Sequence, residues 1–429
     1  MKNNFKKSNQ YLNRSLKTIP LASQTFSKSL TQYPSGVTPY FFSKARGSKV
    51  WDIDGNRYID FVNSLLSISI GYRNKDIDDA VLKQMKNGVI FSMPHKLETE
   101  LAELICKIIP CAESVRFSKN GSDATAGAIR LSRAYTNREH IAVCGYHGWQ
   151  DWYIASTSRN LGVTKSDIKL THSFKYNDIN SLSEIFKKYK NKIAAVILEP
   201  MNIDYPRNNF LEKVKKLTHK NKSILIFDEI CTGFRWSLGG AQEYFNVTPD
   251  LATFGKGIAN GYPLSVLTGK KKIMKLMENI FFSTTFGGET LSLAAAKAVI
   301  IKMMKEPVIK TINLRGRYLK ENLQEIIIQN QLQNTIEIKG HYPWLILNVK
   351  DTEKYSQWEI KTYILQEMIS KGIFFGGAHN ISYSHSEKDI KLLISAYDNV
   401  LNNLNIFIKK NNLRKQIKTK ILKPLFKVR

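Results

Sequence analysis

The most informative segment of the sequence is Ser-Ile-Leu-Ile-Phe-Asp-Glu at residues 223–229, an apolar run that ends in two acids. A short run of this kind, rich in β-branched side chains, is typical of a strand that is buried on both faces of a sheet. Amphipathic helical segments separate it from four similar runs, at Ser114–Phe117, His140–Cys144, Ala194–Leu198 and Asp250–Phe254. This alternation predicts an α/β fold, a mainly parallel sheet covered by helices.

Chemically capable residues follow directly after four of these runs. Ligands of open parallel sheets bind beyond the carboxyl ends of the strands, so these residues are the first candidates for a site. Each group by itself also fits a turn, a helix cap or a solvated lysine, but four of them at strand ends of one sheet are harder to explain in that way. We expect them to converge on one rim: Gly145-Tyr146-His147-Gly148, Glu199-Pro200, Asp228-Glu229 and Gly255-Lys256-Gly257.

A further segment, Ser118-Lys119-Asn120-Gly121-Ser122-Asp123-Ala124, follows the first run and opens a helix. Asn120, Ser122 and Asp123 are good capping residues, and Gly121 permits a tight turn. A plain capped helix is the more economical explanation of this segment taken alone. The functional alternative is a phosphate that backbone N–H groups hold at the helix N-terminus.

Other cofactor sites do not fit the sequence. The glycines around Lys256 have the wrong spacing for a dinucleotide fingerprint, and there is no Gly-x4-Gly-Lys-Ser/Thr phosphate loop. No His/Cys cluster has metal-ligand spacing, and the four cysteines (Cys106, Cys111, Cys144, Cys231) match no zinc or disulfide framework, so we expect reduced thiols and no metal. A phosphate nest, an acid, an aromatic residue and a lysine remain. This set fits an aldehyde cofactor that carries a phosphate.

Several motifs give the chain a family resemblance. The most specific is Asp-Glu-x-x-Thr-Gly-Phe-Arg at residues 228–235, 28 residues before Lys256. Tyr-His-Gly at 146–148, Asn-Gly-Ser-Asp-Ala at 120–124 and Thr-Thr-Phe-Gly-Gly at 284–288 match too. From about Tyr33 to Leu401 the chain resembles the class III (subgroup II) pyridoxal-phosphate aminotransferases, in particular the branch of glutamate-1-semialdehyde 2,1-aminomutase and its relatives. The resemblance implies fold type I and pyridoxal 5'-phosphate as cofactor.

The resemblance also implies roles for individual residues. Lys256 would form the Schiff base and move a proton between the substrate carbon and the cofactor, and Asp228 would pair with the pyridinium nitrogen. The implied cofactor contacts are Tyr146 and Ile230 on the two faces of the ring, Asn120, Gly121 and Ser122 at the phosphate, His147 and Glu199 along the pocket, and Thr285 at the phosphate of the neighbouring subunit. The active sites would therefore be shared in a homodimer that acts on a small-molecule amino donor or acceptor.

Two departures from the aminomutase pattern concern the substrate. Ser35–Phe42 contains no arginine where the aminomutases have one in Gly-Gly-Val-Asn-Ser-Pro-Val-Arg, and Glu289 follows Gly287-Gly288 where they have Ser-Gly-Asn-Pro. Three functions stay open. The chain moves an amino group to or within a carbonyl compound, as the aminomutases do. Alternatively, it uses a separate amino donor on a keto or sugar-type substrate in surface-polysaccharide or secondary metabolism, as the resemblance of residues 145–153 indicates. It could also be a catalytically decayed, basic surface-binding protein, against which the intact pair of Asp228 and Lys256 argues.

The sequence predicts four segments. Residues 1–60 form an arm and a β-hairpin that turns at Asp54-Gly55. Residues 61–306 form the large cofactor-binding α/β domain, in which helices end before Pro110 and Pro307. Residues 307–408 form a smaller α+β C-terminal domain, with strands near 336–338 and 344–349 and helices near 360–369 and 387–404. Residues 409–429 form a basic tail.

The net charge of +28 on 429 residues first suggests a nucleic-acid ligand. However, nine Lys and Arg without any acid fall within residues 1–50, and another nine, again without an acid, fall within residues 409–429. No nucleic-acid-binding motif is present, so we expect no nucleic-acid partner. Residues 1–20 lack the apolar centre of a secretory signal, and no apolar stretch approaches the roughly 18 residues of a membrane span. We expect a cytoplasmic protein.

The basic tail carries an apolar pattern. Leu413, Ile417, Ile421 and Leu425 recur every four residues among lysines and arginines, and Pro424 would end or kink a helix. On a helix this gives an apolar stripe flanked by positive charge, which is typical of a peptide in weak contact with an anionic membrane. The explanation that we favour is that the stripe packs on the protein's own surface, or that the charge is compositional.

Overall fold

The computed structural model describes residues 4–423, which fall into two compact units. One unit comprises residues 75–309, and the other comprises residues 4–74 together with 310–423. This grouping differs from the segments expected from the sequence, because residues 4–60 do not stand apart. Strand β3 (Arg57–Asp60) pairs in parallel with β13 (Ile373–Phe374), so the N-terminal hairpin belongs to the same sheet as a C-terminal strand.

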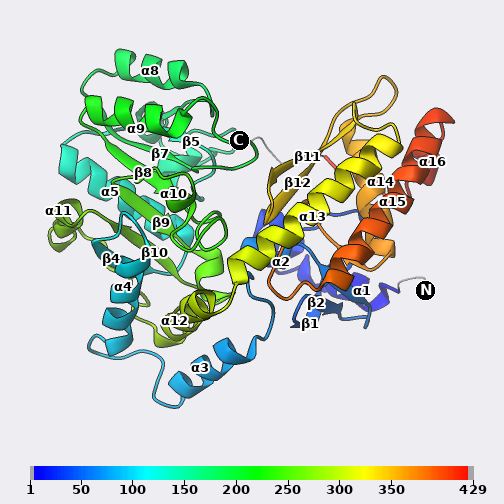
Figure 1. The fold of residues 1–429 in the computed structure, drawn as a ribbon, viewed down its shortest axis with the longest axis horizontal. Coiled ribbons are helices and arrows are strands. Elements are labelled where there is room, and N and C mark those ends of the chain that lie inside the picture. Colours follow the sequence, from blue (N-terminus) through cyan, green and yellow to red (C-terminus); the bar gives the residue numbers. More distant parts are fainter. Residues whose placement is uncertain (1–3, 424–429) are drawn as a thin grey trace. The chain divides into compact units, whose positions relative to one another are not determined.

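The unit of residues 75–309 is built on a seven-stranded sheet (Figure 1). Its strand order is β4-β10-β9-β8-β7-β5-β6, and only β10 runs antiparallel to its neighbours. The five apolar runs all form strands, with ends within one residue of the prediction, and the predicted mainly parallel α/β fold is confirmed. The strands are β4 (Ser114–Ser118), β5 (His140–Cys144), β6 (Thr171–Ser173), β7 (Ile193–Leu198), β8 (Ile224–Asp228), β9 (Leu251–Phe254) and β10 (Ser265–Gly269).

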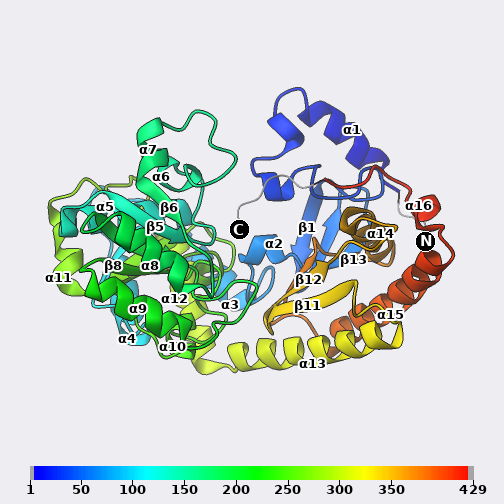
Figure 2. The same cartoon turned by 90° about the horizontal axis from the view of Figure 1, so that it is seen from above.

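Helices cover both faces of this sheet because its central strands are apolar on both sides. Along β7, Ala195 and Ile197 pack in the cluster that contains α5 (Gly121–Thr136). The alternate residues Val196 and Leu198 pack in the cluster that contains α8 (Ile179–Lys188) and α9 (Phe210–Lys220). Figures 1 and 2 show α8 and α9 side by side on their face.

The remaining helices of this unit surround the sheet. The predicted helix before Pro110 is α4, and the helix before Pro307 is α12, which packs against α3 and α4. Their bounds are α3 (Lys75–Met85), α4 (Lys96–Ile108), α6 (Asp151–Ile154), α7 (Lys165–Leu170), α10 (Ala241–Tyr244), α11 (Lys271–Met274) and α12 (Thr290–Lys305), with short 3-10 turns η3 (Lys256–Ala259) and η4 (Lys275–Glu278). Among residues 4–423, no helix is both long and apolar enough to cross a membrane.

The second unit contains two smaller sheets. The order β1-β2-β3-β13 includes the predicted hairpin, in which β2 and β3 are antiparallel, and β11-β12-β14 is a three-stranded antiparallel sheet. A shared apolar core joins the second sheet to three long helices. The elements are β1 (Phe42–Arg46), β2 (Lys49–Asp52), β11 (Ile336–His341), β12 (Trp344–Val349), β14 (Ala378–Asn380), α2 (Asn63–Leu66), α13 (Val308–Gln329), α14 (Gln357–Ser370) and α15 (Glu387–Lys409), together with 3-10 turns η1 (Pro20–Ala22) and η2 (Phe26–Lys28).

The N-terminal arm contains the helix α1 (Lys6–Ser15), which a distant carboxylate caps. Asp54, in the hairpin turn, accepts hydrogen bonds from the backbone N–H of Lys7 at 2.7 Å and of Ser8 at 2.8 Å. An acid at a helix N-terminus satisfies free N–H groups and complements the helix dipole. The hairpin turn therefore anchors the arm.

The basic tail does not form the continuous amphipathic helix that a membrane-bound stripe requires. Helix α16 covers only Leu413–Gln416, and the chain beyond it is not helical up to residue 423. Leu413 and Leu422 are buried in the core of this unit, and the N–H of Leu422 donates to Thr362 Oγ1 on α14 at 3.0 Å. A continuous membrane-bound helix therefore does not form over residues 413–423. Of the stripe, Leu413 is buried and Ile417 packs against the same core, as the favoured explanation expects, whereas Ile421 is exposed. Pro424, Leu425 and Val428 lie outside the described residues.

Leu413→Ala should lower the free energy of unfolding of the unit of residues 4–74 and 310–423 by about 3 kcal/mol, because it leaves a cavity at a fully buried position. Ile421→Ala is the matched control in the same tail. Ile421 is 42% exposed, so its truncation should cost less than about 1 kcal/mol. Urea titration followed by hydrogen exchange of α14 measures both. Equal effects of the two substitutions would contradict the packing of the tail.

Candidate active site

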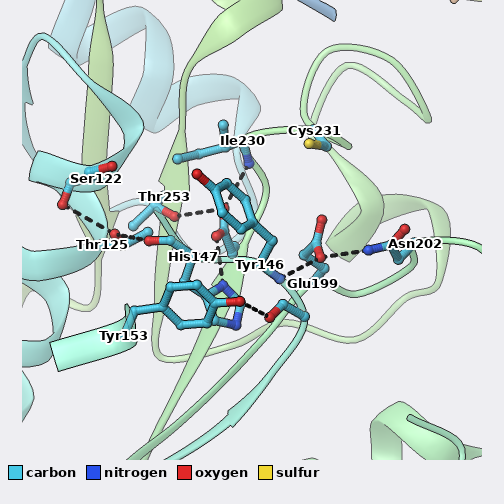
Figure 3. Close-up of polar contacts among 12 residues, drawn as sticks. Ser122, Thr125, Tyr146, His147, Tyr153, Glu199, Asn202, Ile230, Cys231 and Thr253 are labelled. Atoms are coloured by element: carbon cyan, nitrogen blue, oxygen red, sulfur yellow. Dashed lines mark hydrogen bonds and ion pairs between the residues drawn. The ribbon is translucent and has the colours of Figure 1, made fainter. Parts of the chain in front are cut away.

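The predicted site residues of the unit of residues 75–309 gather at one edge of its sheet. Strands β9, β8, β7 and β5 are parallel neighbours, so their carboxyl ends meet at that edge. Figure 3 shows side chains from four origins there: Ser122 and Thr125 of α5, Tyr146 and His147 after β5, Glu199 after β7, and Ile230 and Cys231 after β8.

Asp228, at the end of β8, forms a buried pair with His147. Nδ1 of His147 lies 2.8 Å from Asp228 Oδ2, and since a carboxylate only accepts, the imidazole donates. Asp228 Oδ1 also accepts hydrogen bonds from the N–H of Ile230 at 3.1 Å and from Thr253 Oγ1 at 3.3 Å. Both residues of the pair are at most 3% exposed. The carboxylate is thus held in one orientation by donors from three segments.

The loop after β5 holds His147 in place. Thr125 Oγ1 on α5 donates to the backbone carbonyl of His147 at 2.8 Å. The rings of Trp152 and Tyr153 flank the imidazole at centroid distances of 6.3 and 5.3 Å. The next residue, Gly148, has a φ of 110°, and a Cβ there would lie 2.3 Å from Ser122 Oγ. Glycine is therefore required at this position, for conformation and for space.

Tyr146 and Glu199 are joined through the backbone. The N–H of Tyr146 donates to Glu199 Oε2 at 2.9 Å, and Asn202 Nδ2 donates to the same oxygen at 2.7 Å. Glu199 is buried, whereas Tyr146 remains 36% exposed. The carboxylate of Glu199 thus holds the loop from which the Tyr146 ring projects.

The N-terminus of α5 supplies the candidate phosphate site. The backbone carbonyl of Asn120 accepts the first helical hydrogen bonds from Asp123 and Ala124, so the N–H groups of Gly121 and Ser122 precede the helical ladder. Ser122 Oγ accepts a hydrogen bond from the N–H of Trp149 at 3.3 Å. Such a turn is suited to bind an anion.

Ile230 packs directly on this turn. A Cβ on Gly121 would lie 2.3 Å from Ile230 Cδ1, so the absence of a side chain lets the loop after β8 approach the start of α5. The predicted ring-contacting residue and the predicted phosphate-binding residue are therefore neighbours in space.

Lys256 follows β9 and opens η3 with a φ of 45°. A left-handed conformation costs a residue with a side chain roughly 1–2 kcal/mol and often marks a functional position. Its amine donates a hydrogen bond to the thiol of Cys231 at 2.8 Å. The loops after β8 and β9 thus bring the lysine amine and Asp228 to the same end of two adjacent strands.

The second acid of the Asp228-Glu229 pair has a structural position. Glu229 is buried and accepts hydrogen bonds from the N–H groups of Ala241 at 2.7 Å and Gln242 at 2.8 Å, at the start of α10. Thr232 Oγ1 donates to it as well. Burial raises the pKa of Glu229, although these hydrogen bonds oppose the shift. Its carboxylate caps a helix and is not part of the candidate pocket.

Thr285 lies in the segment before α12, which the ion pair of Glu289 and Lys119 links to the start of α5. It is exposed in the turn of residues 285–288, before α12. The turn is closed by the N–H of Gly287, which donates to the carbonyl of Thr284 at 3.0 Å. Its exposure leaves the hydroxyl accessible to a second subunit.

Some supporting residues were not predicted from the sequence. Thr253 lies within a predicted strand, one residue before its end, where alternation would place its hydroxyl beside Asp228. Cys231 stands within the Asp-Glu-x-x-Thr-Gly-Phe-Arg motif, but nothing in its spacing indicates contact with Lys256. Thr125 lies one turn into α5. Among residues 4–423, no group of three or more His, Cys, Asp or Glu is placed to hold a metal ion.

The chain belongs to the class III aminotransferases, whose family model matches residues 32–387. It is 35% identical over 372 residues to a 3-aminobutyryl-CoA aminotransferase of Cloacimonas acidaminovorans, covering 84% of this chain and 88% of that protein. It is 34% identical over 435 residues to a glutamate-1-semialdehyde 2,1-aminomutase of Alkaliphilus oremlandii, covering 93% and 99%. A structure of the PLP internal aldimine form of the FumI protein of Sphingopyxis sp. MTA144 superposes with a TM-score of 0.88 at 25% identity, covering 97% and 98%.

The protein is therefore an enzyme that depends on pyridoxal 5'-phosphate. The residues present fit this cofactor. A primary amine, a buried carboxylate with a fixed orientation and a helix N-terminus with two N–H groups outside the helical ladder all belong to one edge of the sheet. These groups match the aldehyde, the pyridine nitrogen and the phosphate of the cofactor.

Lys256→Ala should leave the fold intact and lower activity on the order of 10⁴-fold or more, because it removes the amine that we expect to carry the cofactor. Borohydride reduction of the holoenzyme, followed by peptide mapping, should find the cofactor attached to Lys256. The same treatment of Lys271→Ala, which removes an exposed lysine of the same unit, should give the parental map. Attachment to any other lysine would contradict the assignment.

Proposed function

We propose that the enzyme moves an amino group to or within a small carbonyl compound, with Lys256 and Asp228 as its catalytic residues. The observation that carries this proposal is the arrangement of the two side chains. They stand at the carboxyl ends of the adjacent strands β8 and β9, and Asp228 is buried and aligned by His147 at 2.8 Å. A lysine and an oriented acid at one strand edge form the minimal machinery of this chemistry.

When bound, pyridoxal phosphate supplies an electron sink that is effective while its ring nitrogen carries a proton. Asp228 holds that proton by charge pairing, which favours the charged form of the nitrogen. His147, Ile230 and Thr253 keep the carboxylate pointing in one direction. The pairing is strong because the acid is hidden from water.

Further residues position the cofactor in this proposal. Tyr146 covers one face of the ring and Ile230 the other, while Gly121 and Ser122 bind the phosphate through N–H and hydroxyl groups. The carboxylate of Glu199 supports Tyr146 by accepting a hydrogen bond from the Tyr146 backbone N–H. Asn120 contributes through its place at the start of the phosphate turn. Lys256, once free, moves a proton at the substrate carbon.

Two versions of the reaction fit this site. In the first, the enzyme resembles the aminomutases and moves the amino group within one molecule. In the second, a separate donor supplies the amino group. The second is favoured by the absence of an arginine in Ser35–Phe42 and by the presence of Glu289, which forms an ion pair with Lys119 at 2.8 Å. A relative named 3-aminobutyryl-CoA aminotransferase supports the same version.

The homodimer is part of the proposal. Thr285 is exposed in the protomer, and its resemblance to the family's phosphate-contacting threonine assigns it to the site of the partner subunit. The exposed Phe281 and Phe286 lie in the same segment and would be covered in such an assembly. The cytoplasmic location stays a prediction.

The decisive experiment is a screen of keto acids, aldehydes and keto sugars, each with and without L-glutamate or L-alanine as amino donor. The donor-dependent version predicts product beyond one equivalent per site only when the donor is present. Continued turnover without any donor would establish the aminomutase version instead. Absence of amination in both arms, with the cofactor fully loaded, would contradict the proposal.

Thr285→Ala should raise the dissociation constant of pyridoxal phosphate roughly tenfold, since it removes one hydrogen bond to a charged group. Ser283→Ala, at an exposed position in the same segment, should leave it unchanged. Light scattering should give a mass of two chains for the parental protein and both variants. A fully active monomer would exclude a shared site.

A further inference from the structure

An ion pair joins the phosphate turn to the segment that contains Thr285. Lys119 Nζ lies 2.8 Å from Glu289 Oε2, and the two residues are 170 positions apart in the sequence. The two side chains are only 16% and 14% exposed, so solvent screens the pair less than an open surface pair. Lys119 precedes Asn120 at the start of α5, and Glu289 precedes α12.

Glu289 is fixed by the helix that it caps. Its carboxylate accepts hydrogen bonds from the N–H of Leu291 at 2.7 Å, from the N–H of Ser292 at 3.2 Å and from Ser292 Oγ at 2.7 Å. Burial works against ionisation of Glu289, but the hydrogen bonds from Lys119 and Ser292 outweigh it and lower the pKa. The carboxylate is therefore an ionised anchor at the N-terminus of α12.

The other end of the ion pair is the turn that precedes the candidate phosphate site. The N–H groups of Lys119 and Asn120 both donate to Asp123 Oδ2, at 3.3 and 2.8 Å. Ser265 Oγ on β10 donates to the carbonyl of Asn120 at 2.7 Å. These hydrogen bonds hold the backbone of the turn. The long side chain of Lys119 is held separately, by its ion pair with Glu289.

We propose that Lys119 and Glu289 are positioning residues for the cofactor phosphate. The ion pair fixes the turn of Lys119 and Asn120 against the end of α12, and so sets the direction of the N–H groups of Gly121 and Ser122 before the phosphate arrives. A preorganised anion site binds more tightly because binding then costs less conformational entropy. The inference rests on the proposed placement of the phosphate at the N-terminus of α5.

Two other roles for the pair predict different results. If Lys119 attracts the phosphate directly by its charge, Glu289 partly cancels that charge, and Glu289→Gln would strengthen cofactor binding. If the pair only stabilises the fold, its loss would affect every ligand of the site alike. If the pair positions the phosphate site, either substitution should weaken the contribution of the phosphate to binding. The contribution of the pyridoxal ring should not change.

The test compares pyridoxal phosphate with pyridoxal, which has the same ring and no phosphate. The full-length protein, stripped of cofactor, is titrated with each compound. Lys119→Met and Glu289→Gln should each weaken binding of pyridoxal phosphate about tenfold, the scale of one lost charge-assisted hydrogen bond, and change binding of pyridoxal less than about twofold. The double substitution should be no weaker than either single one. Lys119→Arg should restore most of the affinity because it keeps the charge.

Lys297→Met is the matched control, since it breaks another ion pair of α12, with Glu100 at 2.6 Å, that does not involve the phosphate turn. It should leave both affinities unchanged. Tighter binding in Glu289→Gln, or an equal loss for pyridoxal, would overturn the inference. Ser122→Ala distinguishes the positioning role of the ion pair from the placement of the phosphate at the N-terminus of α5. If it lowers the preference for the phosphorylated compound while the ion-pair variants do not, only the positioning role fails. If it has no such effect either, the phosphate placement itself fails.

Discussion

The buried carboxylate of Asp228 organises the active edge of the sheet. Burying an ionised acid costs several kcal/mol unless donors satisfy its oxygens. Here the donors come from the loop after β5, from the loop after β8 and from β9. One carboxylate therefore ties together the ends of β9, β8 and β5, although β7 lies between β8 and β5 in the sheet. Removing the His147 imidazole would leave Asp228 Oδ2 without the hydrogen bond that it accepts, at a cost of about 1–3 kcal/mol.

The lysine that we propose as the Schiff-base residue has a strained backbone. Lys256 has a left-handed backbone between two glycines, and its amine lies against the Cys231 thiol. A strained residue persists only where its surroundings over-determine it, and here the end of β9 and the packed η3 turn do so. The backbone strain therefore falls on the residue to which we assign the chemistry.

The sequence predicted the strands and their ends well, because buried parallel strands are continuous apolar runs with abrupt polar ends. It did not predict β10, whose residues become a strand only between β4 and β9, which are distant in the sequence. The sequence also could not distinguish the role of Asp228 from that of Glu229, because both follow the same apolar run. Only the packing shows that Asp228 contacts His147 while Glu229 caps α10. The pair of Lys119 and Glu289 depends on a contact across 170 residues, which spacing cannot reveal. For the tail, the favoured explanation of packing on the protein's own surface agrees with the structure at Leu413 and Ile417. A period of four residues could not by itself show which surface these residues meet.

We infer that Asp228 keeps a proton on the cofactor's ring nitrogen. Nitrogen-15 magnetic resonance of the enzyme loaded with ring-labelled pyridoxal phosphate tests it most directly, because the chemical shift of that nitrogen reports its protonation. We expect a protonated nitrogen in the parental enzyme at neutral pH and an unprotonated one in Asp228→Asn. A nitrogen that is unprotonated in the parental enzyme, or protonated equally in both proteins, would contradict it.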